Sequence, residues 1–124
     1  MDRKLVATGA ALAGVAVMLG AFGTHALAGR LGPQALGWWQ TAVQYQMWHA
    51  LAVLVLGLNG RDWARWPAWM LAAGALIFAA TLYVMALGGP RLLGAVTPVG
   101  GLLLITGWGL LAWRAISSQP DRRC

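Results

Sequence analysis

Two histidines stand out in a sequence whose long apolar stretches hold few other reactive groups. His25 lies in the stretch GAFGTHAL, and His49 lies in TAVQYQMWHALAVL, where it follows Tyr45 and Gln46 by four and three residues. Side chains at these spacings share one face of a helix. An imidazole can act as a base or bind a metal, and an ionisable group inside a membrane segment is a candidate for function. The two histidines are therefore the first candidates for chemistry.

The sequence offers these histidines no partners for catalysis or metal binding. Two histidines without a carboxylate or thiol in the same apolar stretches supply too few ligands for zinc. The three acidic residues all lie outside the apolar stretches, and the two serines lie near the carboxyl end. A general base also needs a positioned substrate or nucleophile within hydrogen-bond reach. We therefore predict no catalytic residue, no bound metal and no cofactor.

The elements that must position the polar side chains are four apolar runs. Hydrophobic residues make up 60% of the 124 residues and charged residues only 10%, against roughly 25% charged in soluble domains. A soluble domain of this size could not bury so much apolar surface, whereas about 20 apolar residues cross a bilayer as a helix. We predict an all-α fold, a four-helix bundle that forms a single transmembrane domain over residues 1–124. Its helices are expected at about 5–28, 33–58, 67–87 and 98–116.

The basic residues predict the direction of the spans. Seven of the nine lie at the amino end, between the second and third runs, or in the carboxyl tail; only Arg30 and Arg91 lie in the other two connections. Because cytoplasmic loops are enriched in Lys and Arg, both termini are expected in the cytoplasm. The formal net charge of +6 is then explained by orientation and by contact with anionic lipid, and we expect no nucleic-acid partner. The single cysteine, Cys124, is expected to be an unreactive cytoplasmic thiol.

Each predicted span carries a polar residue towards the same side of the membrane. His25 lies late in the first span, Gln46 early in the second, Tyr83 late in the third, and Thr97 at the start of the fourth as its N-cap. This topology predicts a polar cluster in the outer third of the bilayer, with His49 deeper. In the first span, His25 shares a helix face with Ala7, Ala11, Gly14, Met18 and Ala21. Two interpretations remain open: the cluster fixes helix packing by hydrogen bonds, or it lines a pocket for a ligand.

Four stretches carry a resemblance to a known family: GAFGTHAL (20–27), TAVQYQMWHALAVL (41–54), LYVMAL (82–87) and LGAVTPVGGLLLITGW (93–108). They resemble the YgdD-like family of small four-helix bacterial inner-membrane proteins, a family of unknown function with eukaryotic relatives. The resemblance implies four transmembrane helices and a multi-pass location in the bacterial plasma (inner) membrane, but no established activity. It carries over onto His25, Gln44, Tyr45, Gln46, His49, Tyr83, Thr97 and Pro98, of which all but the proline form the candidate polar pocket.

The sequence departs from the family pattern in two places. Thr24 and Ala26 stand where the family usually has Ala and Gly, and Ala79-Ala80 stands where it commonly has Gly-Ser. The second departure removes a hydroxyl from the third span, partly replaced by Thr81. A pocket that needed that serine would be in doubt in this chain.

Three kinds of function fit these observations to different degrees. The first is a non-enzymatic role in interaction, assembly or lipid binding, with the outer polar cluster as its distinguishing feature. The alternative is an oligomeric transporter or channel subunit for small solutes that uses the same cluster. The third is a membrane enzyme with His25 as a base. The expected partners are the lipid bilayer, a lipid or small ligand in the outer half, and further copies of the chain.

Overall fold

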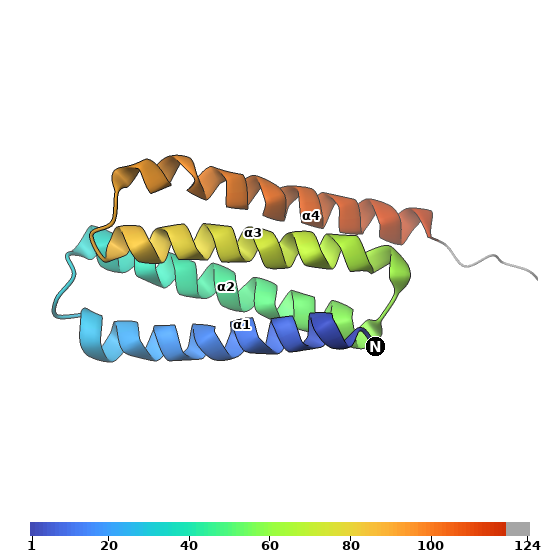
Figure 1. The fold of residues 1–124 in the computed structure, drawn as a ribbon, viewed down its shortest axis with the longest axis horizontal. Coiled ribbons are helices and arrows are strands. Elements are labelled where there is room, and N and C mark those ends of the chain that lie inside the picture. Colours follow the sequence, from blue (N-terminus) through green and yellow to red (C-terminus); the bar gives the residue numbers. More distant parts are fainter. Residues whose placement is uncertain (119–124) are drawn as a thin grey trace, which may run out of the picture.

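The computed structural model describes residues 1–118, which form four long antiparallel helices (Figure 1). These are α1 (Arg3–Phe22), continued by a π-helical turn (Gly23–Leu27), α2 (Pro33–Asn59), α3 (Asp62–Ala86) and α4 (Thr97–Ser117), which follows a 3₁₀ turn (Arg91–Ala95). Each of the four is long and apolar enough to cross a membrane. The expectations for Cys124 and for the basic residues at 122 and 123 lie outside the described residues.

Local sequence explains where the helices begin and end. At the start of α1, the Asp2 carboxylate accepts hydrogen bonds from the backbone N–H groups of Lys4 and Leu5, at 3.1 and 3.2 Å, as an N-cap does. Pro33 opens α2, where a residue without an N–H costs nothing. Gly60 ends α2 in the left-handed conformation, with φ 67°, which glycine adopts without strain.

The third helix begins five residues before the expected start at Pro67, so that prediction was wrong. Pro67 lies inside α3, where its missing N–H leaves the carbonyl of Trp63 without its usual partner. Arg114 of α4 supplies a replacement, because its guanidinium donates to the Trp63 carbonyl at 3.4 Å. A donor from a neighbouring helix is one way in which a membrane helix tolerates an internal proline.

The helices pack in sequence order and leave the bundle open. Helix α1 packs on α2, α2 on α3, and α3 on α4, whereas α1 makes only slight contact with α3. Within residues 1–118, α1 and α4 do not meet, and they lie at opposite edges of the molecule (Figure 1). We call the end that holds the N-terminus and the α2–α3 connection the terminal end, and the opposite end the hairpin end. The two central helices are the more buried ones.

Glycines set the distance between neighbouring helices. A Cβ added at Gly9 of α1 would lie 2.6 Å from the backbone nitrogen of Leu54 in α2. One added at Gly100 of α4 would lie 2.6 Å from the backbone nitrogen of Phe78 in α3. Small residues of this kind let membrane helices approach closely. The α1–α2 and α3–α4 contacts therefore depend on glycine at these points.

The packed face of α1 differs from the face that the sequence suggested. The expected stripe beneath His25 is exposed throughout: Ala7, Ala11, Gly14, Met18 and Ala21. The packed positions instead alternate by four and three residues: Leu5, Gly9, Leu12, Ala16, Leu19 and Gly23. This is the spacing of knobs-into-holes packing. The prediction took the face with the most small residues as the packed one, and this was wrong. The face of α1 that contacts α2 carries leucines as well as glycines.

Candidate functional site

Gln46 joins three helices through one side-chain amide. Its Nε2 donates to the carbonyl of Leu12 in α1 at 2.8 Å, and its Oε1 accepts from the Tyr83 hydroxyl of α3 at 2.8 Å. The side chain is 4% exposed. Gln46 lies thirteen residues from either end of α2, Pro33 and Asn59, or about 20 Å along the axis. Gln46 therefore lies at the middle of α2, and its predicted place in the outer third of the bilayer stays a prediction.

His49 uses both ring nitrogens within the fold. Its Nδ1 lies 2.6 Å from the carbonyl of Tyr45, and its Nε2 accepts from the indole N–H of Trp108 at 3.0 Å. A carbonyl can only accept and an indole N–H can only donate, so the ring is the neutral tautomer with its proton on Nδ1. His49 has no nitrogen left for a substrate or a metal. It instead connects α2 to α4, whose backbones do not approach each other closely.

Thr97 pairs with Thr81, which was not part of the predicted polar cluster. Its hydroxyl donates to the carbonyl of Leu93 at 3.0 Å and lies 2.8 Å from the hydroxyl of Thr81 in α3. Thr97 is the first residue of α4, whose N-cap is Val96. The prediction of Thr97 as the N-cap was therefore wrong. The pair links α3 to α4 near the hairpin end. The sequence signal for it was the lone hydroxyl of Thr81 among the alanines of the third span.

Two of the seven predicted residues do not join any of these pairs. His25 and Gln44 are both exposed, and Gln44 lines a groove of about 430 Å³ between α1 and α2 at the hairpin end. The structure therefore brings together Gln46 with Tyr83, His49 with the Tyr45 backbone, and Thr97 with Thr81, as separate groups. Sequence reasoning missed Trp108 as the partner of His49.

Trp39 is a further polar link that the sequence did not reveal. Its indole N–H donates to the Leu19 carbonyl at 2.9 Å, and its ring centre lies 4.7 Å from that of Tyr83. A Cβ on Gly23 would lie 2.6 Å from this indole. The available signal was Gly23 itself, because a glycine one turn from the helix end makes room for a large partner.

Two further grooves between the helices have mostly apolar linings and are open at the surface of the molecule. One, of about 280 Å³, runs between α1 and α3 and has Gln46 and Tyr83 among its lining residues. Another, of about 380 Å³, lies between α2 and α4 beside Trp108. Among residues 1–118, no three His, Cys, Asp or Glu side chains lie close enough to hold a metal ion. No buried side-chain nitrogen or oxygen of this part lacks a hydrogen-bond partner.

The chain is similar to membrane proteins whose function is unknown. The family model described as "Protein of unknown function (DUF423)" matches residues 19–101. The UPF0382 inner membrane protein YgdD of Escherichia coli K12 is 39% identical over 121 residues, 94% of this chain and 92% of YgdD. A UPF0382 membrane protein of Staphylococcus epidermidis RP62A is 42% identical over 112 residues, 88% of this chain and 92% of that protein.

No solved structure matches the chain significantly. The four apolar helices and the inner-membrane relatives together make this a multi-pass protein of the bacterial inner membrane. The chain belongs to the DUF423 family of membrane proteins of unknown function.

Proposed function

We propose that this protein acts by binding and not by catalysis, and that it binds the hydrocarbon chain of a membrane lipid in the groove between α1 and α3. The observation that carries the proposal is the makeup of this groove. The hydrogen-bonded pair of Gln46 and Tyr83 also lines the groove. The other lining residues are alanine, leucine and valine: Ala11, Leu12, Val15, Leu19, Leu76, Ala79 and Ala80. Hydrocarbon is the chemistry that such walls accept and that the bilayer presents at this depth.

Hydrogen bonding argues against a catalytic role for the same residues. The buried polar side chains of the described part are all paired within the fold, and His49 has no free nitrogen. Gln46 uses one of its two N–H groups and one of its two acceptor positions. The amide could therefore also meet a weakly polar group on the bound chain, such as a carbonyl or hydroxyl.

We also propose that both termini lie in the cytoplasm, from the distribution of basic residues. The terminal end carries Arg3, Lys4, Arg61 and Arg65, whereas Arg30 and Arg91 lie at the hairpin end. The α1–α3 groove would then run through the middle of the membrane, with Tyr83 on its outer side.

The test is a substitution that fills the groove. Ala80 is exposed and lines the groove, so Ala80→Phe should place a ring in it. Ala73 is also exposed, lies seven residues earlier on the same face of α3, and does not line the groove. Ala73→Phe therefore adds the same bulk elsewhere on this face. The measurement is electron paramagnetic resonance of chain-labelled phosphatidylcholine in reconstituted membranes, which counts motionally restricted lipids per protein.

We expect Ala80→Phe to lose about one restricted lipid per protein and Ala73→Phe to lose none. Equal lipid counts in the wild type and in both variants would overturn the proposal. Solute flux through proteoliposomes, measured on the same preparations, distinguishes the transport alternative. A solute flux that requires the protein and falls in Ala80→Phe would favour transport over lipid binding as the function of the groove.

A further inference from the structure

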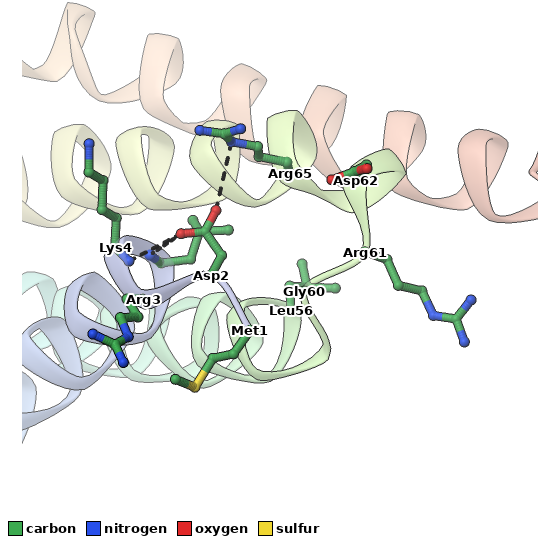
Figure 2. A pocket seen from close by; sticks show the side chains of 10 residues that line it. Met1, Asp2, Arg3, Lys4, Leu56, Gly60, Arg61, Asp62 and Arg65 are labelled. Atoms are coloured by element: carbon green, nitrogen blue, oxygen red, sulfur yellow. Dashed lines mark hydrogen bonds and ion pairs between the residues drawn. The ribbon is translucent and has the colours of Figure 1, made fainter.

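The terminal end of the molecule holds a charged cavity that the lipid groove does not involve. Its volume is about 350 Å³, near the lower end of the range for small-molecule sites. It lies where the start of α1 meets the α2–α3 connection (Figure 2). Four basic and two acidic side chains line it: Arg3, Lys4, Arg61, Arg65, Asp2 and Asp62. Four positive charges against two negative ones leave an excess of two positive charges.

The Asp2 carboxylate does not make this cavity a cation site, because its charge is already engaged. It accepts the backbone N–H groups of Lys4 and Leu5 as the cap of α1. It also pairs with Arg65, whose Nε lies 3.7 Å from the Asp2 carboxylate. Figure 2 shows the Arg65 guanidinium facing the Asp2 carboxylate and Lys4 extending to the same side, while the Arg3 and Arg61 side chains point away from them. The Lys4 side chain has no polar partner among residues 1–118, and the pair with Asp2 uses only the Nε of Arg65. The Lys4 ammonium and the Nη groups of Arg65 therefore remain available to an anion.

The backbone around the cavity is held in place by close contacts. The N–H of Asp2 donates to the Gly57 carbonyl at 2.8 Å, which ties the start of α1 to the end of α2. A Cβ on Gly60 would lie 2.6 Å from the backbone nitrogen of Met1. The first turn of α3, which also borders the cavity, has no side-chain cap, and uncapped N–H groups at a helix start favour anions. The cavity is thus a formed feature with a positive lining.

The position of the cavity along the helices corresponds to the lipid headgroups. Trp66 and Trp113 are both mostly exposed and lie within a turn or two of the terminal end of α3 and α4. Exposed indoles concentrate at the boundary between hydrocarbon and headgroups. A group bound in the cavity would therefore lie at the level of lipid phosphates. Basic residues placed there attract anionic lipid.

We propose that this cavity binds a phosphate group through Lys4 and Arg65. The phosphate is carried either by an anionic phospholipid of the surrounding leaflet or by a free phosphate compound. This site is separate from the α1–α3 groove and does not depend on lipid binding there. A basic residue beside the phosphate of an anionic lipid changes the affinity for that lipid about fivefold, whereas a basic residue outside the cavity does not meet the single lipid bound there. Lys4→Gln and Arg65→Gln should therefore each weaken binding by about that factor.

The experiment uses the full chain, purified and delipidated in a nonionic detergent. Phosphatidylglycerol and phosphatidylcholine with identical chains are titrated separately, and native mass spectrometry gives the affinity for the first bound lipid. The matched control is Arg114→Gln, which removes a positive charge at the same end of the molecule but does not line the cavity. Because Arg114 also donates to the Trp63 carbonyl, circular dichroism must show unchanged helix content in this variant. A parallel titration with inorganic phosphate tests the free anion.

We expect a preference for phosphatidylglycerol that falls about fivefold in Lys4→Gln and in Arg65→Gln, and by less than twofold in Arg114→Gln. If inorganic phosphate also binds with this variant pattern and displaces the lipid, the site is confirmed with free phosphate as its ligand. Equal losses in Lys4→Gln and Arg114→Gln would mean diffuse attraction and overturn the proposal. Binding of neither probe would overturn it as well. Should Arg65→Gln lose helix content, Lys4→Gln alone decides, because the Lys4 side chain makes no contact that the fold needs.

Discussion

The contact between α3 and α4 predicts that one glycine of α4 cannot be replaced by alanine, whereas another can. At Gly100, an added Cβ would lie 2.6 Å from the backbone nitrogen of Phe78 and 2.9 Å from the carbonyl oxygen of Gly74. Both atoms belong to backbone and cannot rotate away, so the helices must separate. At Gly109 of the same helix, a Cβ would meet nothing within 4 Å.

The size of the effect follows from comparing the two substitutions. Both gain the roughly 0.5–1 kcal/mol by which alanine exceeds glycine in a helix, so their difference isolates the steric cost. Overpacking of a close contact costs about 1–3 kcal/mol. Separation of the helices would also stretch the Thr81–Thr97 hydroxyl pair, now 2.8 Å apart, which adds about 0.6 kcal/mol. We therefore expect Gly100→Ala to be about 1.5–3.5 kcal/mol less stable than Gly109→Ala.

The assay is reversible unfolding in mixed micelles, with dodecyl maltoside replaced stepwise by sodium dodecyl sulfate. Far-UV circular dichroism and tryptophan fluorescence follow the transition, and the free energies of unfolding are compared at one detergent ratio. Gly109→Ala should equal or exceed the wild type. If Gly100→Ala and Gly109→Ala unfold within about 0.5 kcal/mol of each other, far less than overpacking costs, the close α3–α4 contact does not exist.

The hydrogen bonds of the buried polar residues give two further predictions. Tyr83→Phe removes the donor to Gln46 and should lower the free energy of unfolding by about 0.6–2 kcal/mol. The control is Tyr45→Phe, which removes a hydroxyl that has no hydrogen-bond partner among residues 1–118. It should change the free energy of unfolding by less than about 0.5 kcal/mol, as substitutions away from such bonds usually do. ¹⁵N NMR of the His49 ring should find the proton on Nδ1 and an unprotonated Nε2 that shifts in Trp108→Phe, whereas an Nε2 proton would rule out the observed bond.

The sequence predicted the membrane fold well because composition and length decide it. Four apolar runs separated by short polar connections allow little besides four spans, and Pro33 and Gly60 mark the ends of α2 by their backbone preferences. Pro67 misled the prediction of α3, because a proline inside a helix is tolerated when another helix supplies a donor. That donor, Arg114, is distant in sequence.

The candidate site was predicted less completely, because it depends on how the helices are rotated. The face of α2 was correct for Gln46 and His49, where polar residues mark the inside of an apolar helix. The face of α1 was wrong, and this error placed His25 in the polar group although it is exposed. The partners of His49 and Thr97, namely Trp108 and Thr81, come from other helices, and spacing within one helix cannot reveal them.

The central claim is that a lipid chain occupies the groove between α1 and α3, and nuclear Overhauser contacts test it most directly. The sample is methyl-labelled protein in deuterated detergent with protonated phosphatidylcholine. The Val15 and Leu76 methyls in the groove belong to residues that are 43% and 57% exposed, whereas the controls Val17 and Leu102 outside it are 61% and 63% exposed. Exposure alone would give the controls the stronger lipid contacts. We predict stronger contacts at Val15 and Leu76; equal or weaker contacts there would contradict the account.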